Sequence, residues 1–183
     1  MPQRSICVFC GSRSGGDPAY EAEATRLGRL LAENGWRLVY GAGDIGLMGA
    51  TARAAQTAGG ETFGVIPMHL MHAERRNADL TSFVVTENMH ERKKVMFMNS
   101  DAIVVLPGGA GSLDEFFEVL TWRQLGLHTK PIFLLNTRDY WAPLTAVLDH
   151  VIEQGFADTS LLGYLEVIDT PEALAAALRA ALS

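Results

Sequence analysis

The stretch AIVVLPGGAGS, residues 102–112, joins an unbroken apolar run to a glycine-rich loop that ends at a serine. An apolar run without polar alternation is typical of a strand buried on both faces of a parallel sheet. A glycine loop after such a strand is typical of a turn into a helix, because glycine adopts positive φ and lets backbone N–H groups approach a ligand. The stretch therefore predicts a parallel α/β sheet with a ligand site at the carboxyl end of this strand.

The rest of the chain repeats this strand-then-helix pattern. Strands are predicted at residues 5–10, 37–40, 62–66, 82–86, 102–106, 132–135 and 165–168. Helices are predicted at residues 18–34, 47–58, 89–100, 112–125, 140–154 and 171–182. Because alternation of this kind implies right-handed crossovers, we expect a Rossmann-like doubly wound parallel sheet of about seven strands with helices on both faces. The whole chain, residues 1–183, is expected to form one domain.

Composition narrows the class of protein. The chain has 183 residues, 48% of them hydrophobic and 20% charged, which is ordinary globular composition and excludes a disordered or fibrous protein. Its formal net charge of −6 argues against a protein that coats nucleic acid. No apolar run reaches the ~18 residues that a membrane helix needs. Residues 1–5 lack the layout of a signal peptide, so we expect a cytoplasmic protein.

The cysteines and two of the histidines could suggest redox or metal chemistry, but their positions favour neither. Cys7 and Cys10 form a CxxC motif, but they lie within a predicted strand, where side chains three residues apart point to opposite faces. We therefore expect two buried thiols rather than a redox pair. His69 and His72 lack the further ligands that a metal site needs, so no metal is expected.

Two other strand-to-helix loops are rich in glycine, at residues 10–16 and 41–49. Three such loops at one edge of a parallel sheet favour a nucleotide or sugar-phosphate ligand over simple tight turns. The second loop fits G-x-G-x-x-G, which raises the alternative of a dinucleotide oxidoreductase. The next strand ends in Gly64-Val65-Ile66-Pro67 without the acid that would hold a ribose, and the motif follows the second strand rather than the first, so this alternative is disfavoured.

The loop at residues 107–112 continues into Leu113-Asp114-Glu115, and this segment has two interpretations. Ser112 and Glu115 match S-x-x-E, in which the serine caps a helix and the glutamate reaches back to it. Alternatively, the loop N–H groups and the Ser112 hydroxyl hold a phosphate, and Glu115 lies beside it on the first helical turn. Spacing alone does not choose between them.

A second group of polar residues begins at Asn88, which together with Glu91 suggests another capping box. Arg92 falls three and four residues from Met89 and Met96, so this cation shares a helix face with apolar residues. It either extends over the core to reach water or points into a cleft.

These motifs resemble the LOG ("lonely guy") family of cytokinin riboside 5′-monophosphate phosphoribohydrolases, whose members have often carried the label "possible lysine decarboxylase". The family signatures are P-G-G-x-G-T-x-x-E and M-H-x-R-K. Residues 107–115 match the first, with Ser112 in place of threonine, and residues 89–93 match the second. The resemblance extends from about residue 6 to residue 156, nearly the whole chain.

The resemblance implies hydrolysis of the N-glycosidic bond of adenosine 5′-monophosphates, often modified at N6, to the free base (a cytokinin or adenine) and ribose 5-phosphate. It assigns catalysis to Arg92 and Glu115. It assigns substrate binding to Glu74, Lys93, Gly109, Ala110, Gly111, Ser112 and Thr121. It also implies a homodimer whose shared helices complete each site. No cofactor is expected, and the composition and the two histidines discussed above lead us to expect no metal and no nucleic-acid or membrane partner.

The residue types suit this chemistry. Cleavage of a ribosyl bond passes through an oxocarbenium-like state that a carboxylate near the anomeric carbon can stabilise, and our hypothesis is that Glu115 does so. Arg92 would hold the substrate and neutralise charge. Decarboxylation with pyridoxal phosphate needs a Schiff-base lysine, and the chain offers only Lys93, Lys94 and Lys130. Two alternatives stay open: a nucleosidase for a wider range of nucleotides, and a nucleotide-binding module without activity.

The sequence departs from the family pattern at a few positions. Ala42 stands where a third glycine is common, and we expect its methyl group to lie where a ligand approaches the backbone. Ala110 stands where tyrosine is common, which would remove a wall of the site. Residues 75–78, Arg-Arg-Asn-Ala, stand where the family usually has a Thr-Gly turn, so the match to the family around Glu74 is weaker than at the other assigned residues.

Overall fold

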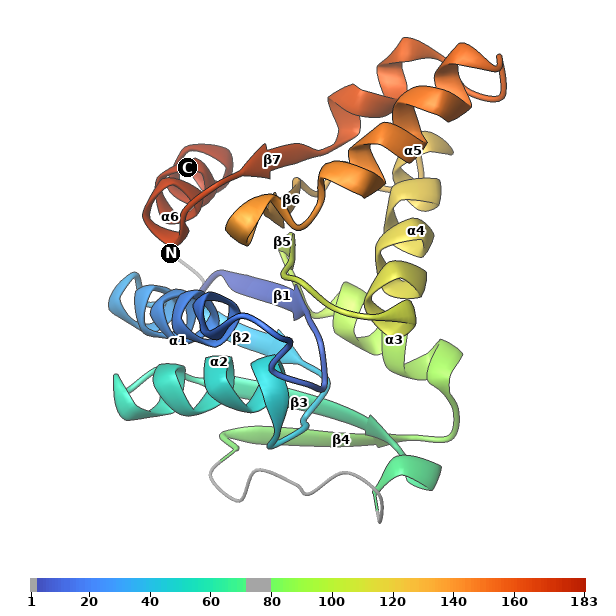
Figure 1. Ribbon diagram of the computed structural model, residues 1–183. Coiled ribbons are helices and arrows are strands. Elements are labelled where there is room, and N and C mark those ends of the chain that lie inside the picture. Colours follow the sequence, from blue (N-terminus) through green and yellow to red (C-terminus); the bar gives the residue numbers. More distant parts are fainter. Residues whose placement is uncertain (1–2, 72–79) are drawn as a thin grey trace.

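The computed structural model describes residues 3–71 and 80–183, and its centre is a parallel sheet of seven strands (Figure 1). The strands are β1 (Ser5–Phe9), β2 (Arg37–Tyr40), β3 (Thr62–Pro67), β4 (Ser82–Thr86), β5 (Ala102–Val105), β6 (Ile132–Leu135) and β7 (Glu166–Ile168). Their order is β4-β3-β2-β1-β5-β6-β7, and every neighbouring pair is parallel. The order reverses direction between β1 and β5, which is the arrangement of a doubly wound sheet.

Helices cover both faces of this sheet (Figure 1). They are α1 (Pro18–Glu33), α2 (Gly46–Thr57), α3 (Met89–Met98), α4 (Ala110–Gln124), α5 (Ala142–Glu153) and α6 (Pro171–Leu182), with short 3-10 turns η1 (Met68–Leu70), η2 (Thr137–Asp139) and η3 (Thr159–Tyr164). One core cluster packs α1, α2 and α6 against the sheet, and the other packs α3, α4 and α5 against its opposite face. The predicted fold class is confirmed. The described helices are all too short or too polar to cross a lipid bilayer.

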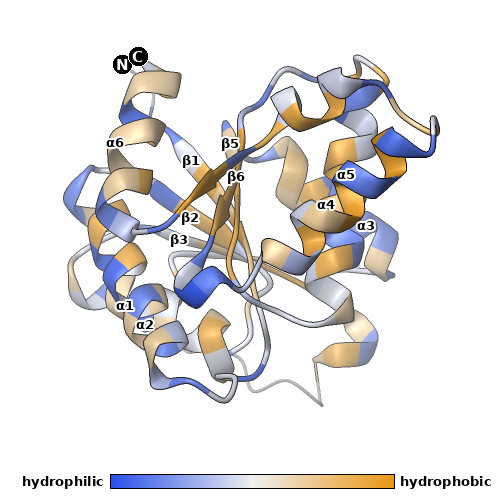
Figure 2. Ribbon diagram, turned by 45° about the horizontal axis from the view of Figure 1, so that its top comes forward, coloured by the Kyte–Doolittle hydropathy of each residue, from blue (hydrophilic) through white to orange (hydrophobic). Residues whose placement is uncertain are grey.

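The central strands lie in the middle of the core, between the two helix layers. Every residue of β1 and β5 is buried, and Figure 2 shows the strands at the centre of the molecule as largely hydrophobic. Cys7 and Cys10 belong to the two different core clusters, so the prediction that they face opposite sides of the sheet is confirmed. Both thiols are free, and burial raises the pKa of each above its ordinary value, which keeps them protonated and unreactive.

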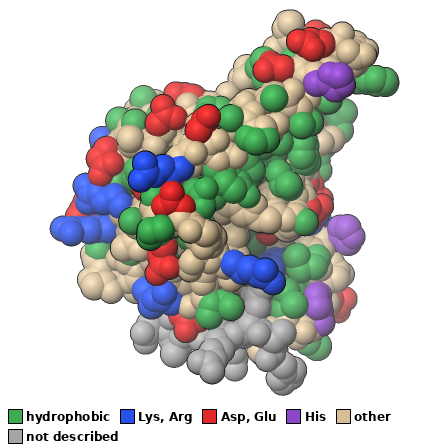
Figure 3. Space-filling view, viewed as in Figure 1, with side chains coloured by type: hydrophobic (Ala, Val, Ile, Leu, Met, Phe, Trp, Pro, Cys, Tyr) green, Lys and Arg blue, Asp and Glu red, His purple; other side chains and the backbone are tan. Residues whose placement is uncertain are grey.

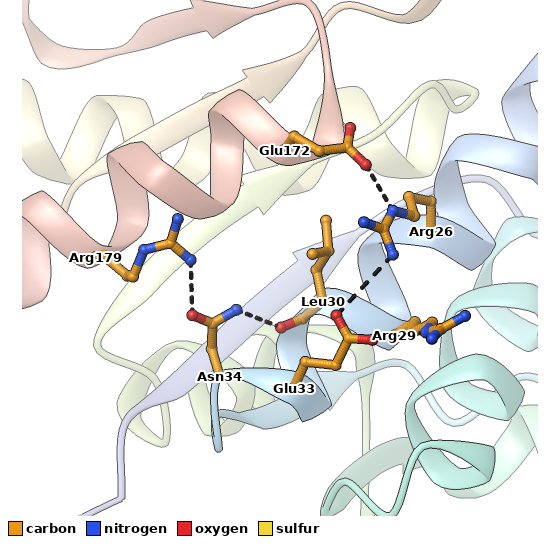
Figure 4. A network of polar contacts seen from close by, with 7 residues as sticks. All are labelled: Arg26, Arg29, Leu30, Glu33, Asn34, Glu172 and Arg179. Atoms are coloured by element: carbon orange, nitrogen blue, oxygen red, sulfur yellow. Dashed lines mark hydrogen bonds and ion pairs between the residues drawn. The ribbon is translucent and has the colours of Figure 1, made fainter.

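Polar contacts join the outer surfaces of α1 and α6 (Figure 4). Arg26 Nε donates to Glu172 Oε1 at 2.6 Å, and Arg179 Nη1 donates to Asn34 Oδ1 at 2.8 Å. These groups are exposed to solvent, so each pair contributes little to stability. Figure 3 shows acidic and basic side chains mixed with one another over the α1 and α6 side of the molecule, on the left of the view.

His128 lies in the turn after α4, and both of its ring nitrogens have partners. Nδ1 accepts from the Lys130 N–H at 3.1 Å, so Nε2 is the nitrogen that donates to the Val119 carbonyl at 2.8 Å. Burial lowers the pKa of His128 from its ordinary value, in spite of the hydrogen bond to Val119, and the nearby Arg123 charge lowers it further. The folded protein therefore holds this imidazole in its neutral form.

Acidification is expected to destabilise the fold through His128, because the unfolded chain binds this proton more readily than the folded chain. The stabilisation of the folded state by neutral His128 is fully present above the pKa of histidine in the unfolded chain, about 6.5. It is lost as the pH falls from that value through the lower pKa of the folded state. Urea unfolding measured between about pH 7.5 and pH 5 should show a steeper loss of unfolding free energy for the wild type than for His128→Gln. Equal slopes for the two proteins would contradict this account.

Candidate active site

The glycine loops meet where the sheet reverses its order, at the carboxyl ends of β1, β2 and β5. The Gly11 N–H donates to the Pro107 carbonyl at 3.0 Å, which ties the loop after β1 to the loop after β5. The Gly11 carbonyl accepts from the Leu47 and Met48 N–H groups at 3.1 and 3.3 Å, which ties the same loop to the start of α2. The three loops predicted to share one edge of the sheet therefore form one connected surface.

This surface encloses a cavity of about 530 Å³. Its walls come from the loops after β1 and β5, from α2, α3 and α4, and from two tyrosines. The lining residues are Val8, Phe9, Cys10, Gly11, Ser12, Arg13, Ser14, Gly15, Tyr20, Gly41, Leu47, Met48, Leu70, Met89, Arg92, Pro107, Gly108, Gly109, Ala110, Gly111, Ser112, Glu115 and Tyr140. Both predicted catalytic residues, Arg92 and Glu115, thus lie on one cavity together with residues 109–112.

The N-terminus of α4 opens on this cavity without a side-chain cap. The helix begins at Ala110 with Gly109 as its N-cap, so Ser112 is not the cap and the interpretation of residues 112–115 as a capping box is wrong. The first backbone bond of the helix runs from the Leu113 N–H to the Gly109 carbonyl at 3.1 Å. Within residues 3–71 and 80–183, the N–H groups of residues 109–112 consequently have no acceptor.

Two glycines leave space beside these N–H groups. A Cβ atom added at Gly109 or Gly111 would meet no described atom within 4 Å, whereas one added at Gly108 would lie 2.1 Å from Ser112 Oγ. The Ser112 side chain is buried against Gly108. The loop is therefore packed tightly on its inner side and open on the side where a ligand could reach the N–H groups.

Arg92 points into the sheet edge rather than over the core into water. It is 4% exposed, its Nε donates to the Val65 carbonyl at 3.1 Å, and its Nη2 donates to the Gly41 carbonyl at 2.6 Å. A Cβ atom at Gly41 would lie 2.1 Å from Nη2, so a larger residue there would displace the guanidinium from this position. The Asn88 side chain accepts from the Glu91 N–H at 3.0 Å and caps the helix that carries Arg92, as the sequence predicted.

Two predicted substrate-binding residues lie away from the cavity. Lys93 Nζ contacts Asp114 Oδ2 at 2.9 Å and Glu118 Oε2 at 3.0 Å, which joins α3 to α4. Burial lowers the pKa of Lys93, but the hydrogen bonds that it donates to both carboxylates outweigh that effect and raise the pKa overall. Thr121 is exposed, and its hydroxyl donates to the Phe117 carbonyl. The remaining predicted residue, Glu74, lies outside the described part of the chain, as does His72.

The expectation for Ala42 is wrong, whereas Ala110 lies where the sequence places it. Ala42 has a φ of 63° and is fully buried, and its methyl group lies 2.9 Å from the position that a Cβ at Gly64 would occupy. The methyl group thus packs between β2 and β3 and does not line the cavity. Ala110 is exposed at the cavity wall.

The side chains of the cavity that the sequence analysis missed include Arg13, Tyr20 and Tyr140. Arg13 lies inside a loop already singled out for its glycines, so its position in that loop was the available signal. Tyr140 follows β6 at the same edge of the sheet, and its hydroxyl donates to the Gly108 carbonyl at 2.6 Å. That contact joins residues too distant in sequence for spacing to reveal.

The geometry of the site argues against dinucleotide binding and against chemistry on a lysine or a metal ion. The N–H groups of Leu47 and Met48 at the start of α2 are occupied by Gly11, so the G-x-G-x-x-G loop supports the fold of the neighbouring loop and does not leave those groups for a pyrophosphate. No lysine is among the described lining residues. Among residues 3–71 and 80–183, no group of three His, Cys, Asp or Glu side chains is arranged to hold a metal ion.

Comparisons with known proteins agree with these features. Residues 48–178 match a family model described as "Possible lysine decarboxylase". The chain is 43% identical over 153 residues to the cytokinin riboside 5′-monophosphate phosphoribohydrolase LOG7 of Arabidopsis thaliana, over 84% of this chain and 70% of that protein. It is 41% identical over 177 residues to the cytokinin riboside 5′-monophosphate phosphoribohydrolase of Rhodococcoides fascians, over 96% of this chain and 89% of that protein.

Among solved structures, the molybdenum cofactor carrier protein of Chlamydomonas reinhardtii superimposes with a TM-score of 0.75 at 22% identity, over 98% of both chains. A DNA processing protein A from Helicobacter pylori superimposes with a TM-score of 0.60 at 15% identity. At these identities the likeness concerns the fold alone.

Proposed function

The chain belongs to the LOG family of cytokinin riboside 5′-monophosphate phosphoribohydrolases, and from this membership we propose that it hydrolyses the N-glycosidic bond of adenosine 5′-monophosphates, including N6-modified ones. It is an N-glycosyl hydrolase, and its products are the free base and ribose 5-phosphate. The observation that carries the proposal is the cavity on which the uncapped α4 N-terminus, Glu115 and Arg92 meet.

The 5′-phosphate binds at the start of α4. Residues 109–112 offer N–H groups without acceptors in the described chain, and the helix dipole adds about half a positive charge at the same place. Such a helix terminus suits an anion, and the buried Ser112 side chain packs against Gly108 behind the N–H groups that would hold it. Binding energy from the phosphate orients the ribose relative to Glu115, which lies on the first turns of the same helix.

Glu115 acts at the anomeric carbon. As the C1′–N9 bond breaks, its electron pair leaves with the base, which takes up a proton, and positive charge develops on the ribose. The Glu115 carboxylate stabilises that charge and orients the water whose oxygen bonds to C1′. Arg92 is held on the cavity wall by the Gly41 and Val65 carbonyls, so its positive charge acts on the nucleotide without the cost of ordering a flexible side chain.

The lysines do not support the decarboxylase activity in the family description. Lys93 is paired with Asp114 and Glu118, and Lys130 Nζ donates to the Phe97 carbonyl and lies over the Phe97 ring. Lys94 is exposed, and none of the three lysines is among the described lining residues, so none offers an amine on the cavity for a Schiff base.

We also propose that the protein is a cytoplasmic homodimer without a nucleic-acid or membrane partner. Met98, Leu125 and Leu127 are about two-thirds exposed near the ends of α3 and α4, where a second copy would cover them. Lys93 and Thr121 lie on the same two helices, so this pairing would bring them towards a shared site. Glu74 remains a proposed substrate-binding residue, and residues 1–183 are proposed to form a single domain.

The proposed function is tested by base release from four substrates: AMP, N6-isopentenyl-AMP, adenosine and N6-isopentenyladenosine. We expect rapid release of base and ribose 5-phosphate from the two monophosphates and little from the nucleosides, measured by chromatography. GMP and CMP are assayed beside these four, and equal rates for AMP, GMP and CMP would indicate a nucleosidase with a wider range of bases and contradict the proposed substrate class. Tight AMP binding without release from any substrate would indicate a binding module and overturn the proposal.

A further inference from the structure

The peptide between Gly108 and Gly109 is held by a side chain from a distant part of the sheet edge. Tyr140 lies between β6 and α5, and its hydroxyl donates to the Gly108 carbonyl at 2.6 Å. The preceding carbonyl, that of Pro107, accepts a hydrogen bond from the Gly11 N–H. In the described chain, the Tyr140 hydroxyl is the group that holds the next carbonyl, that of Gly108. Two neighbouring peptides of the loop are therefore anchored from the segments that follow two different strands, β1 and β6.

This contact determines where the Gly109 N–H points. In a planar trans peptide the carbonyl and the following N–H point in opposite directions, so holding the Gly108 oxygen also fixes the Gly109 hydrogen. Glycines on both sides leave such a peptide few steric barriers to rotation. Without Tyr140, the first of the N–H groups proposed to bind phosphate would sample more than one orientation.

Tyr140 itself is held firmly in place. Its ring packs edge-on against Tyr20 and Trp141, with ring centroids 5.6 and 4.8 Å away. The preceding residues Arg138 and Asp139 both adopt positive φ, at 55° and 57°. Non-glycine residues adopt this conformation at an energetic cost, and they do so where the surrounding structure requires it.

Side-chain contacts stabilise this turn. The Asn136 side chain accepts from the Trp141 N–H at 2.8 Å, and Arg138 Nε lies 3.6 Å from Asp17 Oδ2. The Asn136 contact braces the strained turn next to Tyr140, and the exposed Arg138–Asp17 pair adds little to it. The turn and the ring contacts together place the Tyr140 hydroxyl.

We propose that Tyr140 is a positioning residue that orients the Gly109 N–H for the 5′-phosphate and so contributes to the preference for phosphorylated substrates. This inference rests on the proposed phosphate site but not on turnover. It assigns to Tyr140 no contact with the reacting atoms, so its loss should weaken binding of the phosphorylated ligand and leave the chemical step intact.

The test compares Tyr140→Phe with Tyr164→Phe, since Tyr164 loses the same hydroxyl away from the cavity. Both are made in a Glu115→Gln background so that bound AMP is not consumed, and the dissociation constants of AMP and adenosine are measured by calorimetry. Loss of one neutral hydrogen bond in Tyr140→Phe should raise the dissociation constant of AMP about fivefold. The dissociation constant of adenosine should stay unchanged. Tyr164→Phe should change neither.

The same substitutions with Glu115 intact provide a kinetic readout. Tyr140→Phe should raise KM for AMP by a similar factor while kcat stays within about twofold of the wild type. An unchanged AMP affinity, or equal weakening of AMP and adenosine, would overturn the proposal. If the wild type releases no base from AMP, the proposed hydrolysis fails, and the two dissociation constants still decide the role of Tyr140.

Discussion

Replacing Glu115 with glutamine is expected to lower kcat for AMP hydrolysis by about 10²- to 10⁴-fold and to leave the fold unchanged. The side chain is only partly buried at the cavity wall, and glutamine has nearly the same shape, so packing on α4 is preserved. What the amide lacks is the negative charge that stabilises the developing ribosyl cation, together with the ability to accept a proton from water.

The matched control is Glu153→Gln at the exposed end of α5, which removes the same charge outside the cavity and should retain full activity. Steady-state kinetics and thermal unfolding would be measured on both variants. A Glu115→Gln enzyme with nearly wild-type kcat would show that another group acts at the anomeric carbon.

Replacing Arg92 with alanine is expected to abolish activity and also to destabilise the protein by about 2–3 kcal/mol. Hydrogen bonds from a charged donor contribute about 1.5–3 kcal/mol, and this substitution leaves the buried Gly41 and Val65 carbonyls without their donor. Arg92→Lys should recover part of the stability but little activity, because one ammonium cannot span two carbonyls in the fixed geometry of a guanidinium.

Lys94→Ala is the control for the arginine variants, since Lys94 is the exposed cation two positions along the same helix. Chemical denaturation would measure the unfolding free energy, and base release would measure activity. An active Arg92→Ala enzyme with unchanged stability would contradict both the structural and the chemical role of this side chain.

The order of elements was predictable because hydrophobic runs and glycine positions are local signals. The strands at residues 82–86 and 132–135 and the helix at residues 171–182 have the predicted bounds. The meeting of three glycine loops followed from the rule that parallel strands present their carboxyl ends at one edge. The pairing of these motifs with Arg92 and Glu115 was supplied by the resemblance to a family and not by spacing.

Features that depend on contacts between distant residues were not predictable in this way. The S-x-x-E pattern placed the cap at Ser112, but the loop is anchored by Gly11 and Tyr140, which lets the helix begin earlier, with Gly109 as its cap. The methyl group of Ala42 turned away from the cavity because Gly64 on β3 leaves room for it. The bond from Tyr140 to Gly108 spans 32 residues, and no local pattern indicates it.

The most direct test of this account is a crystal structure of the Glu115→Gln protein soaked with AMP. We expect phosphate oxygens within about 2.7–3.2 Å of the N–H groups of residues 109–112, with C1′ of the ribose beside the side chain of residue 115. A phosphate bound elsewhere, such as at the start of α2, or a ribose with C1′ turned away from residue 115, would contradict it.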